Sequence, residues 1–340
     1  MRPPLALALL VSFAGVLIAQ NGSVAALFAS VRSALQQGQS DRQIAQAIGR
    51  EKLSEKLEDA VVEELQSAGA GPETMEALDQ QQELSEKLPV PAQPLELFDT
   101  PPTPSAAEQS QTLHKTREIA LQYTAALPNF LCTETVRRFM RSKSGDDWKP
   151  VDTLTIDLAY SEKGEQYRLA AMNGRSTTKK LSDVGGVMSN GEFGSLLKTI
   201  FDPKSTTAFQ WERWTRLRGR LTYVFSYRID QKHSQYTINW NTLLRHYHGT
   251  YAMSGAVYID RETGQVMQFS DQGEGIPAGW PVLATRATVD YDYAGINGQK
   301  FLLPRSVDSR VTLKSGESRN RVEFQNYRKF SAETNLTFDK

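Results

Sequence analysis

The sequence predicts an α+β protein, in which a curved antiparallel β-sheet (a half-barrel) is covered by helices and preceded by a small all-α module. Two observations carry this prediction. Apolar residues recur with the period of a helix across residues 22–87, and they alternate with polar residues with a period of two from Leu131 onward. The chain has 340 residues, which exceeds the usual length of one domain, so we expect more than one folded unit.

The first residues have the pattern of a signal peptide, residues 1–19. Arg2 supplies a positive start, and "PLALALLVSFAGVLIA" supplies an apolar run that is short for a membrane span. Polar sequence begins at Gln20. We therefore expect an exported protein, periplasmic or extracellular, although a retained membrane anchor is the alternative interpretation.

The helical module is predicted at residues 22–87. Ser40 and Gln43 form a capping-box pattern, and Pro72 follows a glycine-rich stop in the position that suits the first turn of a new helix. Residues 21–87 hold 6 basic and 12 acidic side chains, whereas residues 88–340 hold 32 and 27. The acidic surplus indicates either a solvated surface or a surface that docks on the more basic remainder of the chain or on an envelope protein partner.

A linker is predicted at residues 88–106, because six prolines in this stretch prevent regular hydrogen bonding. The half-barrel domain follows at 107–340, led by a helix over 106–126. A second helix is expected within 190–201, where Phe193, Leu196, Leu197 and Ile200 share one side.

Strands are predicted wherever the alternation is one-sided, a pattern typical of antiparallel sheet. "DRETG" at 260–264 and "AGING" at 294–298 indicate hairpin loops. The strands are expected at 131–142, 153–160, 165–173, 217–229, 235–240, 250–260, 265–270, 287–293, 301–313 and 319–328.

The single cysteine, Cys132, lies in "ALPNFLCTETVRRF" at 126–139 and cannot form an internal disulfide. No histidine is near it in sequence, and a nucleophilic thiol needs a base and a lowered pKa. Strand geometry carries Arg137 and Arg138 away from it. Cys132 is therefore interpreted as a small buried hydrophobic residue.

Other motifs give weak signals for chemistry. His246 and His248 lie two apart, so both rings would point the same way from a strand and could share a metal if a third ligand joined them. In "WERWTRLRGR" (211–220), Arg216, Arg218 and Arg220 are interpreted as a solvated strand face. The formal net charge is zero, so the chain lacks the basic surplus typical of nucleic-acid binding.

The order of elements over 107–340 resembles that of periplasmic lipoprotein carriers and related sensor half-barrels, the LolA/LolB/RseB-like superfamily. The likeness lies in export, a leading helix, a long antiparallel meander, an inserted helix and the late hairpin "YDYAGINGQKFLLPRSVDSRV". The carriers lack the helical module. The chain is also similar to exported bacterial proteins that join such a module and a proline linker to "LPNFLCTETVRRF", a likeness that implies no activity.

These observations favour a non-enzymatic binding protein that holds a lipid or an acylated protein, with no cofactor, no catalytic residue and no metal site. Two alternatives stay open: an envelope scaffold that docks through residues 22–87, and a metal-dependent hydrolase that uses His246 and His248. A filled core is an equal interpretation of the apolar stripes. The residues predicted to line the half-barrel are Tyr223, Phe225, Tyr227, Val257, Ile259, Met267, Phe269, Val289 and Tyr291.

Overall fold

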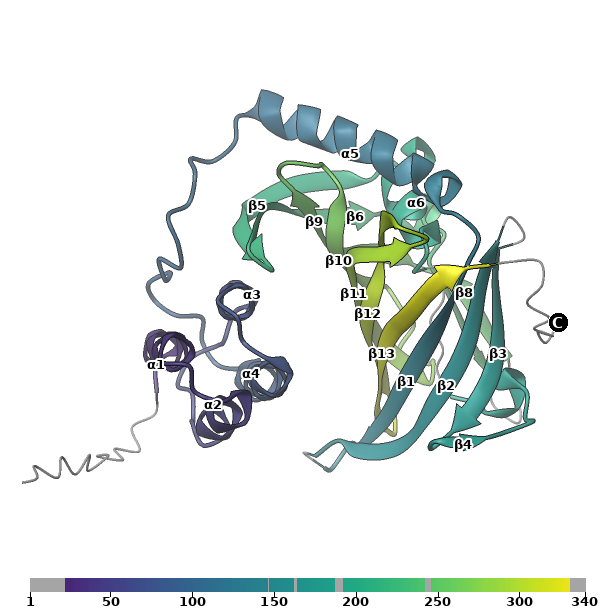
Figure 1. Ribbon diagram of the computed structural model, residues 1–340, viewed down its shortest axis with the longest axis horizontal. Helices are drawn as coiled ribbons and strands as arrows, with labels where there is room; N and C mark the ends of the chain where they lie inside the picture. Colours follow the sequence, from purple (N-terminus) through teal and green to yellow (C-terminus); the bar gives the residue numbers. More distant parts are fainter. Residues whose placement is uncertain (1–21, 146, 162–163, 187–191, 242–245, 331–340) are drawn as a thin grey trace, which may run out of the picture. The chain divides into compact units, whose positions relative to one another are not determined.

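The computed structural model describes residues 22–145, 147–161, 164–186, 192–241 and 246–330 (Figure 1). The chain divides into two compact units, with the main boundary between Asp99 and Thr100. The predicted signal peptide lies outside the described residues. No helix in the described ranges is long and apolar enough to span a membrane.

The first unit holds four short helices: α1 (Val24–Gln36), α2 (Asp41–Ile48), α3 (Asp59–Ser67) and α4 (Pro72–Ser85). The predicted capping box is present, since the Ser40 amide donates to Gln43 Oε1 at 3.2 Å. Pro72 occupies the first turn of α4, as predicted. The helices bury one shared apolar core, which includes Leu27, Val31, Ile44, Ile48, Leu57, Leu65 and Leu78.

The second unit begins with α5 (Ala106–Ala126), and its described part contains an open sheet of eleven strands in the order β4-β3-β2-β1-β13-β12-β11-β10-β9-β6-β5. The strand pairs from β4 to β6 in this order are all antiparallel, so the predicted half-barrel of the α+β class is confirmed. The strands are β1 (Phe130–Ser142), β2 (Lys149–Ser161), β3 (Gly164–Met172), β4 (Arg175–Ser176), β5 (Ala208–Leu217), β6 (Arg220–Ile229), β9 (Ala252–Asp260), β10 (Val266–Glu274), β11 (Val282–Ile296), β12 (Gln299–Leu313) and β13 (Gly316–Lys329).

One strand prediction was wrong. Residues 217–229 are not a single strand, because a turn separates β5 from β6. Arg218 and Gly219 have φ of +48° and +77°, and such a left-handed pair reverses the chain as in a tight hairpin. Arg216, Arg218 and Arg220 therefore do not alternate along one strand face. Both predicted hairpin loops, at 260–264 and 294–298, do connect strands.

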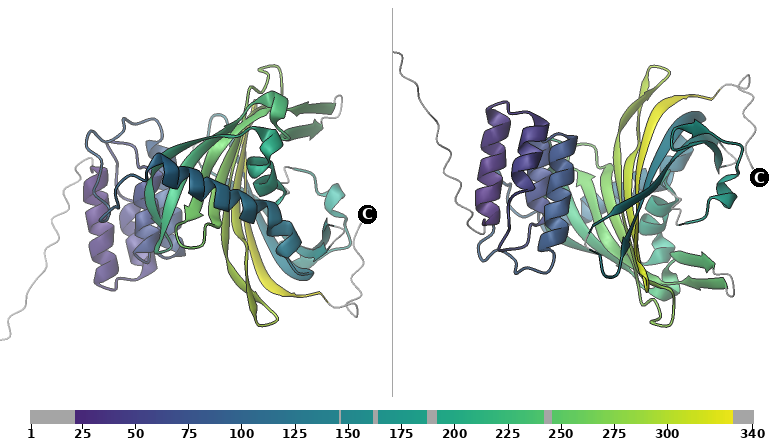
Figure 2. Two further views of the ribbon diagram at one scale, coloured as in Figure 1. Left: turned by 90° about the horizontal axis from the view of Figure 1, so that it is seen from above. Right: turned by 90° about the horizontal axis from the view of Figure 1, so that it is seen from below.

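Helices and a small hairpin line the inner side of the curved sheet. Figure 2 shows α6 (Ser195–Phe201) inside the curve, with the hairpin of β7 (Thr237–Asn241) and β8 (His246–Thr250) near one end of it. The predicted helix over 190–201 thus begins at Ser195, and its first two residues lie outside the described part. Helix α5 runs along one rim: Thr116 Oγ1 donates to the Gly264 carbonyl at 2.9 Å and Tyr123 Oη to the Leu302 carbonyl at 2.8 Å.

Candidate functional site

The concave face of the sheet brings the predicted lining residues together. All nine are buried, with exposed fractions between 0 and 5%. Phe225, Val257, Phe269 and Val289 are directly opposed across neighbouring strands. The other five lie two residues from one of these on the same strand, so the period of two places them on the same face.

Those four residues belong to a longer apolar row that crosses eight strands without a polar interruption. We call it the apolar row. Its face meets the segment just before α6, since Phe130, on the same side of β1 as Val136, has its ring 5.4 Å from that of Phe193. From β2 to β6, the apolar row consists of Leu154, Val136, Val322, Val307, Val289, Phe269, Val257 and Phe225.

A second row on the same face, one residue pair farther along the strands, is polar. It is here called the polar row. Four of its members, Arg138, Asn320, Ser309 and Asp271, are 3–8% exposed, although such side chains are rarely buried. From β2 to β10, the polar row consists of Asp152, Arg138, Asn320, Ser309, Ala287 and Asp271.

An ion pair anchors one end of the polar row. Arg138 Nε and Nη2 donate to the two carboxylate oxygens of Asp152, both at 2.6 Å. Arg138 Nη1 donates to the Gly185 carbonyl, also at 2.6 Å. This bidentate geometry is the arrangement in which a buried arginine and a carboxylate satisfy each other. It also ties the segment before α6 to the inner face of the sheet.

The other end of the polar row is less well satisfied. Burial raises the pKa of Asp271 to about 7, while a hydrogen bond from Tyr236 acts in the opposite direction. The hydroxyl oxygen of Ser309 is fully buried and has no hydrogen-bond partner in the structure. A buried hydroxyl without a partner costs free energy, so this position can accept or donate a bond to a polar guest.

Glu134 is a further buried carboxyl on the same side of β1 as Val136 and Arg138. Its Oε2 atom is buried without a hydrogen-bond partner. Burial, and then the charges of Glu192 and Glu165, raise the pKa of Glu134 to about 8. The side chain is therefore largely protonated at neutral pH, and it adds a second polar point beside the apolar row.

Sequence reasoning missed this polar set, although a signal for it existed. Arg138 lies two residues after Val136, and Asp271 lies two residues after Phe269. The same alternation that placed the apolar residues on the inner face therefore also placed these two side chains there. Their polarity suggested solvent exposure, whereas the structure buries them.

Aromatic side chains close the space between the inner face and its cover. The Tyr291 ring makes an edge contact with Tyr123 of α5 at 5.9 Å, and Tyr291 Oη donates to the Glu192 carbonyl at 2.6 Å. Phe193 lies among Phe130, Tyr160 and Phe324, with ring centres 5.4–6.0 Å away. These rings and the segment that carries Phe193 therefore cover the inner face at this end of the sheet.

The residues considered for catalysis are placed as follows. Cys132 is 2% exposed, and burial raises its pKa well above the usual thiol value, so the thiolate that nucleophilic attack requires is scarce. His246 and His248 share one side of β8 with ring centres 6.3 Å apart, and His248 Nδ1 lies 2.6 Å from Asn239 Oδ1. Within the described ranges, no three His, Cys, Asp or Glu side chains form a metal-binding group.

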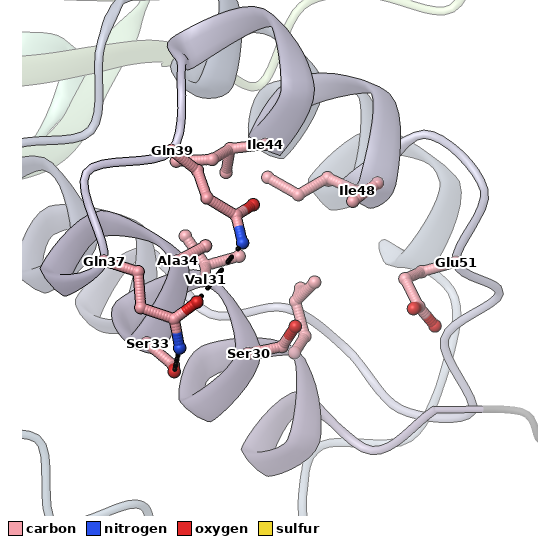
Figure 3. Close-up of a pocket in the computed structure, with 11 residues that line it drawn as sticks. Ser30, Val31, Ser33, Ala34, Gln37, Gln39, Ile44, Ile48 and Glu51 are labelled. Atoms are coloured by element: carbon pink, nitrogen blue, oxygen red, sulfur yellow. Dashed lines mark hydrogen bonds between the residues drawn. The ribbon is translucent and has the colours of Figure 1, made fainter. Parts of the chain in front are cut away.

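Two pockets are lined by residues outside the apolar row and the polar row. One, of about 230 Å³, opens between α1 and α2, where Gln39 and Gln37 line it with Ile44 and Ile48 (Figure 3). The other, of about 400 Å³, is lined by Trp240, Tyr247, Gly279, Pro281, Leu313, Lys314 and Ser315.

Comparison with known proteins gives a likeness of fold. No family model matches the chain, and no curated protein matches its sequence. A LolA superfamily protein from Nitrosomonas europaea has 12% identity and a TM-score of 0.30, over 65% of this chain and 93% of that one. A putative outer membrane lipoprotein-sorting protein domain from Vibrio parahaemolyticus has 10% identity and a TM-score of 0.30, over 66% and 92%.

The lipoprotein LppX of Mycobacterium tuberculosis is similar at 10% identity and a TM-score of 0.24, over 68% of this chain and 99% of that one. The resemblance predicted from the sequence is therefore found among solved structures as a likeness of fold. At these scores it carries no argument about a ligand, which depends on the residues of the inner face.

Proposed function

We propose that the sheet unit is an exported, non-enzymatic binding protein for an amphiphile such as a lipid or the acyl chain of a lipoprotein. The chain of the guest would lie along the apolar row, and its polar end would meet the polar row. One observation carries the proposal: the two rows run side by side on the same buried face. Two polar atoms on this face, Ser309 Oγ and Glu134 Oε2, are buried without a hydrogen-bond partner, which costs free energy unless a polar guest satisfies them.

The apolar row is long enough for this purpose. Neighbouring strands lie about 4.8 Å apart, so eight strands span roughly 34 Å along the sheet. Each methylene group removed from water contributes about 0.8 kcal/mol. A chain of ordinary lipid length therefore gains enough free energy to offset the displacement of some covering side chains.

Helix α5, which covers one rim of the sheet, buries few of its residues, so its movement would give the guest a route to the inner face. Only Thr116, Ala120 and Tyr123 of the 21 residues in α5 are buried. The helix follows the proline-rich linker, whose residues are largely exposed. A helix with so few buried apolar contacts lies at the low-stability end of a fold, where lids are commonly found. Movement of α5 would open the space beside Tyr291.

The proposal is tested by titrating the protein with 11-(dansylamino)undecanoic acid and by native mass spectrometry after gentle purification. We expect saturable fluorescence enhancement and a mass adduct that long-chain fatty acids displace. Val307→Thr keeps the side-chain volume but places a hydroxyl in the apolar row, so we expect binding weakened by about 3- to 10-fold.

The matched control is Thr288→Val, which changes the same pair of residue types on the opposite face of the neighbouring strand. It should leave the affinity within about twofold of the parent protein, because its side chain lies outside the proposed path of the guest. A protein that carries no adduct and does not bind the probe would overturn the proposal.

A further inference from the structure

The pocket of about 400 Å³ lies between the β7–β8 hairpin and the turn that joins β12 to β13. Its volume falls within the range of roughly 300–1,000 Å³ that small-molecule sites occupy. We call it the aromatic pocket. None of its lining residues belongs to the apolar row or the polar row, so the proposed carrier function does not explain it. They are Trp240, Tyr247, Gly279, Pro281, Leu313, Lys314 and Ser315.

Aromatic rings form one wall of the aromatic pocket. Trp240 and Tyr247 are directly opposed in the register of β7 and β8, so their side chains lie on the same face of the hairpin. The Tyr247 ring lies 5.4 Å from that of Trp280, tilted by 60°, and Trp280 makes an edge contact with Tyr251 at 5.3 Å. Tilted and edge contacts are the arrangements that aromatic rings prefer, and a further ring can join this series.

The wall is supported from below, so the aromatic pocket is formed before any ligand arrives. Trp240, Trp280 and Leu313 pack against a small buried cluster beneath them. The Lys314 amide also donates to the Pro281 carbonyl at 3.0 Å, which ties the two loops of the pocket together. A preformed site loses little entropy on binding. The cluster consists of Ile238, Tyr251, Val282 and Val311, which are 0–8% exposed.

The charge at the mouth of the aromatic pocket is positive. Lys314 is exposed, and its Nζ atom donates to the Gly279 carbonyl at 3.0 Å. Within the described ranges Lys314 forms no ion pair, and an ammonium group has three donors, so it can bind an anion as well. Lys143, also exposed, adjoins the same turn, because its amide donates to the Ser315 carbonyl at 3.3 Å. Two ammonium groups disfavour a cationic ligand and favour an anion.

We propose that the aromatic pocket binds a small organic anion in which an aromatic ring lies close to a carboxylate. The ring would pack against Trp240 and Tyr247, and the carboxylate would accept hydrogen bonds from Lys314 Nζ and the Ser315 hydroxyl. Gly279, Lys314 and Ser315 are exposed, so the carboxylate would stay partly hydrated and avoid most of the cost of burial. The proposal stands whether or not the inner face binds an amphiphile.

The test uses ligand-detected NMR on the full chain with matched small molecules. N-acetyl-L-phenylalanine should bind about three- to fivefold more tightly than its amide, which has the same ring without the charge. N-acetyl-cyclohexylalanine keeps the charge and the ring size without the aromatic face, so we expect it to bind about 2- to 10-fold more weakly. Equal affinity of the acid and the amide, or of the aromatic and the cyclohexyl acid, would overturn the proposal.

Two lysine variants locate the site. Lys314→Met removes the charge and keeps an unbranched apolar side chain, so it should abolish the preference for N-acetyl-L-phenylalanine over its amide. Lys300→Met is the matched control, since Lys300 is exposed at the opposite end of β12, and it should leave both affinities within about twofold. The same response in both variants would show that the ligand binds elsewhere.

Trp240→Leu keeps an apolar side chain but removes one aromatic face, and it should weaken binding of the acid and of the amide alike. Thermal unfolding shows whether this variant is folded, and the lysine pair decides the question if it is not. The same chemistry occurs in a free aromatic acid and in the C-terminal residue of a polypeptide. Binding of N-acetyl-Ala-Ala-Phe at least tenfold tighter than that of N-acetyl-L-phenylalanine would assign the polypeptide as the source, whereas equal binding would assign the free acid.

Discussion

At the scale of single residues, the buried hydroxyl of Ser309 distinguishes a binding face from a filled core. Its oxygen has no hydrogen-bond partner in the structure, so Ser309→Ala removes a cost and loses no bond. We expect the melting temperature to stay the same or rise by a few degrees, while affinity for the dansylated fatty acid falls about threefold or more. Calorimetry and fluorescence titration measure the two effects separately.

The control for this prediction is Ser306→Ala, the same change three residues earlier on β12. Ser306 lies opposite Asp290 and Glu323 on the convex face, so the substitution should leave probe affinity unchanged. If Ser309→Ala lowered the melting temperature and left affinity intact, Ser309 would be part of the fold and not of the binding face.

Glu134 gives a prediction for how the stability of the protein depends on pH. Its pKa is raised from 4.5 to about 8 by burial and by Glu192 and Glu165, so the native state holds this proton more tightly than the unfolded chain does. The free energy of unfolding therefore decreases as pH rises from about 4.5 to about 8. Asp271, with a pKa raised to about 7, acts in the same direction.

Glu134→Gln should flatten this dependence. The amide cannot ionise, so at pH 8 we expect a melting temperature several degrees above that of the parent, and little difference at pH 5. Unfolding measured at half-unit pH steps checks the slope, and Glu323→Gln, on the exposed convex side, is the control. Parallel curves for the parent and Glu134→Gln would show that Glu134 ionises in the native state as freely as in solution.

At the scale of elements, the period of two placed most strands within a few residues, and the helix predicted over 106–126 has the observed bounds of α5. It failed where backbone conformation, not side-chain pattern, decides: the left-handed pair Arg218 and Gly219 breaks a run that reads as one continuous strand. The alternation also predicted which apolar residues share the inner face. It could not show that Arg138 and Asp271 are buried, because burial of a charge depends on partners brought by distant strands.

Helix α5 is the element whose movement the carrier proposal requires. Tyr123→Phe removes the bond to the Leu302 carbonyl and keeps the ring against Tyr291, at a cost of about 1 kcal/mol. We expect faster hydrogen exchange over α5 and a faster association rate for the probe, with β1 and β12 unaffected. Tyr293→Phe, at a position 36% exposed, is the matched control. Unchanged hydrogen exchange over α5 in Tyr123→Phe would show that the bond from Tyr123 to the Leu302 carbonyl does not hold α5 against the sheet.

At the scale of the whole molecule, the two compact units allow the bound amphiphile to be assigned to one of them. Units with separate cores commonly unfold in separate transitions. A ligand at 100 times its dissociation constant stabilises only the unit that binds it, by about 2.7 kcal/mol. For a unit of more than 200 residues this amounts to about 5–10 °C, so calorimetry with the dansylated fatty acid should raise the transition of the sheet unit and leave that of the helical unit unchanged. A shift confined to the helical unit would place the guest in the pocket between α1 and α2, and the concave face would then be a core.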